Sequence, residues 1–142
     1  MHTVLTGAAG MIGRKLTARL LAGKKLNGKP IEQLTLLDVS APERPGNSSA
    51  RVAALAGDLG EPAIARAAVA ERPDVIFHLA AIVSGEAELD FEKGMHVNFD
   101  GSRALLEAIR AIGDGYHPRF VFASSIAVLA RPFRKPFRMI SR

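Results

Sequence analysis

Three glycines in the stretch "TGAAGMIG" have the spacing of a phosphate-binding turn. Gly7, Gly10 and Gly13 follow a β-branched run at residues 2–6 and open a segment with helical periodicity. In such a strand–turn–helix unit, the first glycine permits the tight turn and the second lets the backbone approach a pyrophosphate at the helix N-terminus, whereas the third lets helix and strand pack closely. A glycine-rich turn without a ligand is the alternative, but this context favours dinucleotide binding.

A carboxylate closes the second predicted strand, residues 31–39. Asp38 stands 25 residues beyond Gly13, where its side chain can accept hydrogen bonds from both hydroxyls of an adenine ribose. A negative charge there repels a 2′-phosphate, which favours NAD over NADP. A solvated aspartate at a strand end is the alternative, and Arg44 and Arg51 are close enough in sequence to neutralise a phosphate.

A second carboxylate, Asp58, closes the third predicted strand, residues 51–58. Its side chain could contact the adenine amino group, with Leu59 packing against the edge of the ring. The alternative role is N-cap of the helix predicted to start near Glu61–Pro62, and the two roles are compatible.

The fourth predicted strand, residues 74–81, ends in "HLAA". Small residues at the carboxyl end of a strand leave room for a ligand to lie across the sheet. A single His78 in this apolar run is typical of a core histidine whose nitrogens are both hydrogen-bonded. No second His, Asp or Glu stands at ligand spacing, so we expect no metal site.

Polar residues also interrupt the last two predicted elements. Asn98 breaks the apolar face of a helix predicted from about Glu88 to Ile112, and a buried amide must find partners. A structural role is favoured over direct chemistry, with contacts to the loops around the cofactor. Ser124 and Ser125 end the fifth predicted strand, where they face the cofactor and a hydroxyl can hydrogen-bond a substrate carbonyl or alcohol.

The predicted strands and helices alternate, which indicates right-handed βαβ units around a parallel sheet. The expected strand order is 3-2-1-4-5, with ligands bound at the carboxyl ends of the strands where the order reverses between the first and fourth strands. The candidate residues above all lie at that edge. The fold class is therefore α/β, with a Rossmann-type sheet.

Composition narrows the possible partners. The chain has 142 residues, no cysteine, 48% hydrophobic residues and a net charge of +5. Residues 1–130 contain 14 Lys or Arg and 14 Asp or Glu, so the whole excess comes from the last twelve residues. A nucleic-acid-binding face on the domain is therefore not expected. No signal peptide or membrane-spanning run is found, and a cytoplasmic location is expected.

Together, "TGAAGMIG", Asp38, "GDL", "HLAA", "VNFDGS" and "FASSIAV" resemble the extended short-chain dehydrogenase/reductase family, the NAD-dependent epimerase/dehydratase group. The resemblance covers about residues 1–129, the expected NAD-binding domain, and excludes a basic tail at 130–142. The segment "HLAAIVSGEAELDFEKGMHVNFDGSRALLEA" resembles the D-erythronate dehydrogenase branch more than the nucleotide-sugar epimerases.

The resemblance implies NAD as cofactor and a role for each candidate residue. Asp38 would hold the adenosine ribose, and Asp58 and Leu59 the adenine. Ser125 matches the catalytic Ser/Thr that hydrogen-bonds the reacting oxygen. The residues implied to line the pyrophosphate are Gly7, Ala9, Gly10, Met11 and Ile12. Those implied to flank the nicotinamide half are Leu79, Ala80, Ala81 and Val83.

In the D-erythronate branch, the implied reaction is oxidation of the C2 hydroxyl of a sugar acid to a 2-keto acid. The alternatives are a fragment of a nucleotide-sugar epimerase or dehydratase and a non-catalytic NAD-binding module. The implied partners are a sugar acid or nucleotide sugar, and oligomers are possible for full-length relatives.

One departure from the family is severe. Its chemistry needs a Tyr-x-x-x-Lys helix beyond the fifth strand, with the tyrosine as general base. The only tyrosine here is Tyr116, which precedes that strand, and position 120 is Phe. The later strands and the substrate domain are also missing from the pattern. We therefore expect a truncated chain that is inactive as it stands.

The tail "RPFRKPFRMISR" matches no part of the family pattern. Codons compatible with "RKPFRMIS" encode "PEAIPDDF" when read one base earlier, which is the acidic, proline-containing loop expected after "SSIAV". We hypothesise a reading-frame shift near Val128–Arg131. A gene sequence whose alternate frame reaches a stop before encoding Tyr-x-x-x-Lys would contradict this hypothesis.

Overall fold

Five parallel strands form the sheet that carries the candidate site. The computed structural model describes residues 1–46, 48–113 and 115–125. The sheet has the order β5-β4-β1-β6-β7, and every neighbouring pair is parallel. This is the predicted order 3-2-1-4-5, so the predicted fold class is confirmed. The strands are β1 (His2–Thr6), β4 (Gln33–Asp38), β5 (Arg51–Ala56), β6 (Val75–His78) and β7 (Arg119–Phe122).

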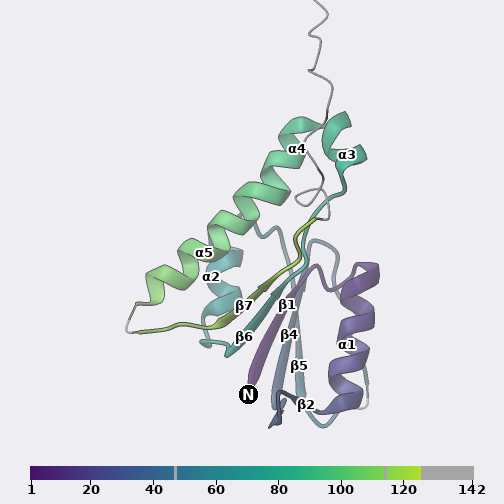
Figure 1. Cartoon of the computed structure of the whole chain (residues 1–142), viewed down its shortest axis with the longest axis vertical. Coiled ribbons are helices and arrows are strands. Elements are labelled where there is room, and N and C mark those ends of the chain that lie inside the picture. Colours follow the sequence, from purple (N-terminus) through teal and green to yellow (C-terminus); the bar gives the residue numbers. More distant parts are fainter. Residues whose placement is uncertain (47, 114, 126–142) are drawn as a thin grey trace, which may run out of the picture.

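Helices cover both faces of this sheet (Figure 1). Helix α1 (Met11–Gly23) lies on one face, whereas α2 (Pro62–Val69) and α5 (Gly101–Ile112) lie on the other. Between α1 and β4 the chain forms a small antiparallel ribbon, β2 (Lys25–Leu26) with β3 (Lys29–Pro30). The predicted boundary at residue 129 and the basic tail lie outside the described residues.

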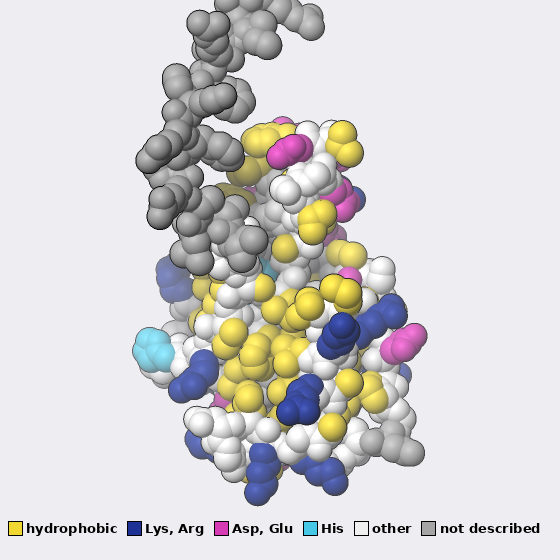
Figure 2. Space-filling model, turned by 45° about the vertical axis from the view of Figure 1, so that its right-hand side comes forward, with side chains coloured by type: hydrophobic (Ala, Val, Ile, Leu, Met, Phe, Trp, Pro, Cys, Tyr) yellow, Lys and Arg dark blue, Asp and Glu magenta, His cyan; other side chains and the backbone are white. Residues whose placement is uncertain are grey.

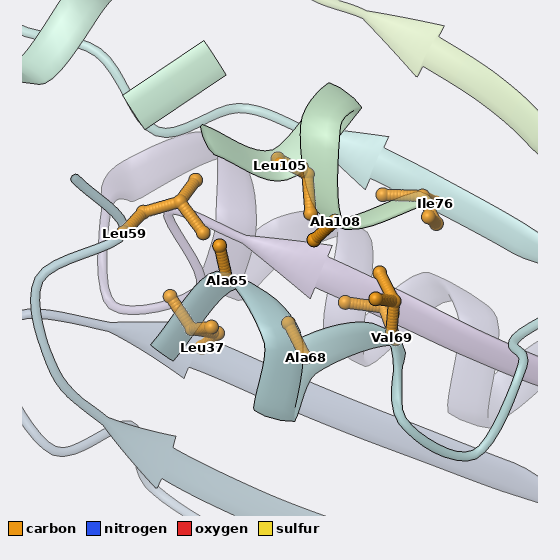
Figure 3. Packing of buried hydrophobic residues seen from close by; sticks show 9 residues of the cluster. Leu37, Leu59, Ala65, Ala68, Val69, Ile76, Leu105 and Ala108 are labelled. Carbon is orange, nitrogen blue, oxygen red and sulfur yellow. The ribbon is translucent and has the colours of Figure 1, made fainter. Parts of the chain in front are cut away.

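Alternation along the strands builds a hydrophobic core on each side of the sheet. On one side, buried Leu5, Leu34 and Leu36 belong to the cluster that includes Leu20 of α1. On the other side, the cluster joins strands β1, β4 and β6 to α2 and α5, as Figure 3 shows. Its buried members are Val4, Leu37, Leu59, Ala65, Ala68, Val69, Ile76, Leu105 and Ala108.

The prediction of one long helix from Glu88 to Ile112 is wrong over its first part. Three elements precede α5: α3 (Ser84–Leu89), α4 (Phe91–Met95) and the π-helical turn η1 (His96–Asp100). Asp90 separates α3 from α4, because its backbone leaves the helical region at φ −135° and ψ 88°. Its side chain then caps α4 by accepting a 3.0 Å hydrogen bond from the Lys93 amide.

Two of the three glycines are required by close backbone contacts. Gly7 has φ +71°, and a Cβ there would lie 2.7 Å from the backbone nitrogen of Ala80. A Cβ on Gly13 would lie 2.1 Å from the carbonyl oxygen of Gly7. The end of β1, the start of α1 and the end of β6 therefore pack backbone against backbone.

The sheet edge at β7 exposes apolar surface. β7 is the last strand in the described sheet, and Val121 and Phe122 are 38% and 55% exposed. The face seen in Figure 2 also carries a patch of hydrophobic side chains with Lys and Arg at its borders. Such surface favours association of the isolated chain.

A glycine pair tests the packing at the end of β1. Gly13→Ala is expected to destabilise the fold by about 3 kcal/mol, because the new methyl group overlaps fixed backbone. Gly23→Ala is the matched control, since a Cβ at the end of α1 meets nothing within 4 Å. It should change stability by less than about 1 kcal/mol, as helix propensity requires. Urea unfolding measures both variants, and equal losses would contradict the packing account.

Candidate cofactor-binding site

A cavity of about 410 Å³ opens where the strand order reverses, at the carboxyl ends of β1, β4, β5 and β6. Both predicted carboxylates, Asp38 and Asp58, line it. Gly7 of the glycine turn and the last three residues of "HLAA" also line this cavity. The predicted residues on its wall are Gly7, Asp38, Asp58, Leu59, Leu79, Ala80 and Ala81.

A second cavity of about 710 Å³ adjoins the first. The two share the segment 80–82 in their walls, so they lie next to each other at the end of β6. Ser124 and Ser125 line the second cavity together with Val83 and Asn98. The structure thus brings the serines predicted for the reacting end close to the segment predicted to flank nicotinamide.

Helix α1 starts without an anion of its own. Its N-cap is Gly10, no side chain in the described part of the chain caps it, and its first turn has no acidic residue. The first amides of a helix carry partial positive charge and lack partners within the helix, so they suit a pyrophosphate. Met11 and Ile12 are 70% and 56% exposed beside this turn. The turn therefore fits a dinucleotide, although Ala9, Gly10, Met11, Ile12 and Gly13 do not line these two cavities.

Asp38 is tied to the glycine turn. One carboxylate oxygen accepts a 2.9 Å hydrogen bond from the backbone amide of Ala9, and the other accepts a 3.3 Å bond from Ser40. These bonds orient the carboxylate at the cavity wall. A carboxylate oxygen has more than one lone pair, so Asp38 can also accept from a ribose hydroxyl.

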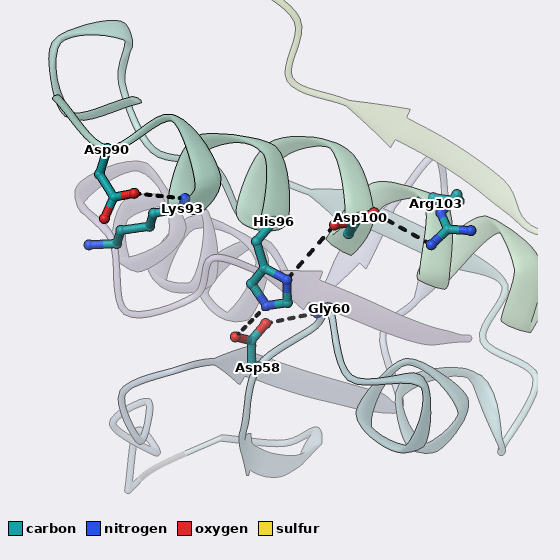
Figure 4. A network of polar contacts seen from close by, with 7 residues as sticks. All are labelled: Asp58, Gly60, Asp90, Lys93, His96, Asp100 and Arg103. Atoms are coloured by element: carbon teal, nitrogen blue, oxygen red, sulfur yellow. Dashed lines mark hydrogen bonds and ion pairs between the residues drawn. The ribbon is translucent and has the colours of Figure 1, made fainter. Parts of the chain in front are cut away.

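Asp58 is held from two sides (Figure 4). One oxygen accepts from the Gly60 amide at 2.8 Å, and the other lies 2.9 Å from Nε2 of His96. Burial raises the pKa of this carboxyl, but the hydrogen bonds from Gly60 and His96 outweigh it, so the net pKa is lowered. The alternative role considered for Asp58, N-cap of α2, is not what the structure has. The N-cap of α2 is Glu61, and Asp58 accepts from the Gly60 amide in the preceding turn.

Asn98 fastens the loop after β6. Its Oδ1 accepts from the Ile82 amide at 2.9 Å, and its Nδ2 donates to the Ile82 carbonyl at 3.1 Å. This pair confirms the expected contact with a loop around the site. The expected burial is wrong, since Asn98 is exposed at the cavity edge.

His78 is the predicted core histidine, with both nitrogens hydrogen-bonded. Its Nδ1 lies 2.7 Å from the Thr6 hydroxyl, and its Nε2 lies 2.8 Å from the Ser102 hydroxyl. Ser102 itself donates to the Asn98 carbonyl, so it accepts from His78 and the proton sits on Nε2. Burial lowers the pKa of His78 to about 4, which keeps the ring neutral.

Tyr116 lies at the other end of the sheet from Ser124 and Ser125. Its hydroxyl donates a 2.8 Å hydrogen bond to the carbonyl of Pro73, in the turn that precedes β6. Burial, reinforced by the nearby Asp74 carboxylate, raises the pKa of Tyr116 to about 12. Both its position and its pKa are unsuitable for a general base at the site.

Several residues that line the first cavity were not predicted from the sequence. His96 faces Asp58 across 38 residues, and the first cavity is also lined by Glu86 and Lys93. Lys93 forms an ion pair with Glu86. These residues lie in a polar helix segment without any local motif, so only the tertiary fold brings them to the cavity.

A Rossmann-type sheet with a glycine turn and two carboxylates at its switch point defines a dinucleotide-binding class of protein. The chain belongs to the NAD dependent epimerase/dehydratase family, whose pattern matches residues 3–139. NAD is therefore the cofactor of its family. No helix in the described ranges is long and apolar enough to cross a membrane.

Known proteins similar to this chain are much longer. D-erythronate dehydrogenase from Cupriavidus necator is 49% identical over 132 residues, which make up 90% of this chain and 40% of the relative. The nucleoside-diphosphate-sugar epimerase from Agrobacterium tumefaciens superposes with a TM-score of 0.86 at 59% identity, covering 90% of this chain and 38% of that one. A uronate dehydrogenase variant from the same organism, complexed with NAD, superposes with a TM-score of 0.66 at 35% identity. The match covers 87% of this chain and 40% of that one.

The neutral state of His78 predicts acid sensitivity. Between its ordinary pKa of 6.5 and its folded pKa of about 4, the unfolded chain binds a proton that the folded chain does not. This contribution to stability is fully present above pH 6.5 and is lost as the pH falls toward 4. The loss between pH 8 and pH 5 is about 2 kcal/mol.

Urea unfolding at the two pH values measures the slope, with His78→Gln as the comparison. The glutamine can donate and accept hydrogen bonds but does not titrate in this range. An unchanged slope in the variant would show that His78 is not the group responsible.

Proposed function

We propose that the chain is the NAD-binding portion of an oxidoreductase that resembles D-erythronate dehydrogenase. One observation carries the proposal: both carboxylates and Gly7, the first glycine of the turn, line one cavity at the switch point of the sheet. The identity to D-erythronate dehydrogenase supports the substrate class. The domain responsible would span residues 1–129, with the basic tail outside it.

The binding roles follow from position. The N-terminus of α1 would hold the pyrophosphate, Asp38 the adenosine ribose, and Asp58 the adenine amino group. The nicotinamide half would lie along Ala80 and Ala81 into the second cavity. NAD, when bound, supplies the hydride acceptor. The small side chains of "HLAA" leave that path open.

Ser125 is the residue proposed to contact the reacting oxygen. It lines the second cavity, where a hydroxyl can hydrogen-bond the C2 oxygen of a sugar acid. Proton transfer needs a base that the described residues do not provide at this place, since Tyr116 hydrogen-bonds Pro73 at the far end of the sheet. The 142-residue chain is therefore proposed to bind NAD without turning over substrate.

A second substrate class is supported by a specific comparison. The structure similar at a TM-score of 0.86 is a nucleoside-diphosphate-sugar epimerase. A nucleotide-sugar enzyme would use the same cofactor cavity, because the two classes differ in substrate-binding residues beyond the sheet. A third possibility is a non-catalytic NAD-binding module. This possibility also predicts NAD binding but no reaction in any full-length protein.

Cofactor titration by calorimetry tests the proposal. The chain should bind NAD more tightly than NADP, because the Asp38 carboxylate repels a 2′-phosphate. Asp38→Asn should weaken NAD binding about tenfold, as expected for loss of a charged hydrogen-bond acceptor. The Asp38→Asn variant should also show a smaller preference for NAD over NADP.

Glu107→Gln is the charge-matched control, since Glu107 lies on the exposed side of α5 and pairs only with Arg103 among the contacts described. NAD affinity should not change in this variant. Absence of NAD binding by the parent chain would reject the proposal. Production of NADH from D-erythronate by this chain would reject the proposed inactivity but not the cofactor site.

A further inference from the structure

His96 connects the helical segment over the site to the adenosine end of the cavity. Its Nε2 lies 2.9 Å from Asp58, and both residues line the 410 Å³ cavity. Asp58 has no other side-chain partner among the interactions described for it, only the Gly60 amide. The direction of one carboxylate oxygen therefore depends on the imidazole.

The imidazole ring packs tightly against the loop that carries Asp58. A Cβ on Gly60 would lie 2.4 Å from Cε1 of His96 and 2.7 Å from its Nε2. The ring therefore fills the space beside the Gly60 backbone. In this position Nε2 faces the Asp58 carboxylate, as Figure 4 shows.

The π-helical turn places His96 and Asn98 in contact with different loops. His96 begins η1, and the amide of Gly101 bonds to the His96 carbonyl five residues earlier. Within this turn, His96 reaches Asp58 after β5, whereas Asn98 reaches Ile82 after β6. Both loops line the cavity, and π-turns of this kind recur at functional sites.

We infer that His96 is a positioning residue: its Nε2 hydrogen bond directs the Asp58 carboxylate for cofactor binding at the adenosine end of the cavity. This inference rests on the proposed function, since it concerns the same cavity. A donor at Nε2 occupies one lone pair of one Asp58 oxygen, and the carboxylate keeps other lone pairs that can accept from the adenine amino group.

Among the interactions described, the charged groups around His96 do not compete with it for Asp58. Asp58 faces Nε2, and Asp100 lies 3.9 Å from Nδ1 on the following turn. Lys93 also lines the cavity, but it is paired with Glu86 of α3. Arg103 is shared between Asp100 and Glu107. Two carboxylates thus lie beside the ring, whereas both nearby cations have acidic partners of their own.

NAD affinity measured by calorimetry at pH 8 tests the inference in the 142-residue chain and two variants. His96→Gln keeps an amide donor within reach of Asp58. His96→Leu removes the donor. The comparison of the two variants therefore isolates the donor at position 96.

His96→Gln should bind NAD within about twofold of the parent chain, because its amide replaces the imidazole as donor. His96→Leu should bind NAD about three- to tenfold more weakly than His96→Gln, because Asp58 loses its donor.

Two results would overturn the inference and leave the proposed function intact. One is equal NAD affinity of the glutamine and leucine variants. The other is an NAD affinity of the leucine variant equal to that of the parent chain. Absence of NAD binding by the parent chain would overturn both the inference and the proposed function, so the two failures are distinguishable.

Discussion

The close backbone packing between β1, α1 and β6 is the constraint on which the site depends. Gly7 can turn the chain beside Leu79 and Ala80 only because it has no side chain, and Gly13 packs on Gly7 for the same reason. This contact brings the N-terminus of α1 next to the small residues after β6. The wall of the first cavity and its connection to the second follow from it.

A chain of hydrogen bonds then fixes the helical segment above the strands. Thr6, His78 and Ser102 link β1 through β6 to α5, and Asn98 and His96 extend the link to the loops after β6 and β5. Removing a buried partner leaves an unsatisfied polar group, so each link specifies the position of the segment. Burial at the centre of this chain of hydrogen bonds keeps His78 neutral, which links the packing under the site to acid sensitivity.

Sequence reasoning succeeded where local rules operate. The strand order, the glycine turn and the satisfied nitrogens of His78 follow from hydrophobic runs, spacing and the need to pair buried polar groups. It failed at Asp90, whose local backbone conformation and side-chain cap break the predicted helix. It also failed where tertiary contacts decide, since it did not predict that Asp58 bonds His96 or that Asn98 is exposed. The Asp58–His96 contact joins residues 38 positions apart, so no local pattern could reveal it.

The central claim, that this chain holds NAD at the carboxyl ends of its strands, is most directly tested by amide NMR spectra of the labelled chain during NAD titration. The account predicts the largest shifts at residues 7–13, at Asp38 and Asp58, and at residues 79–82, with little change in the β2–β3 ribbon. Shifts confined to other surfaces, or none at saturating NAD, would contradict it.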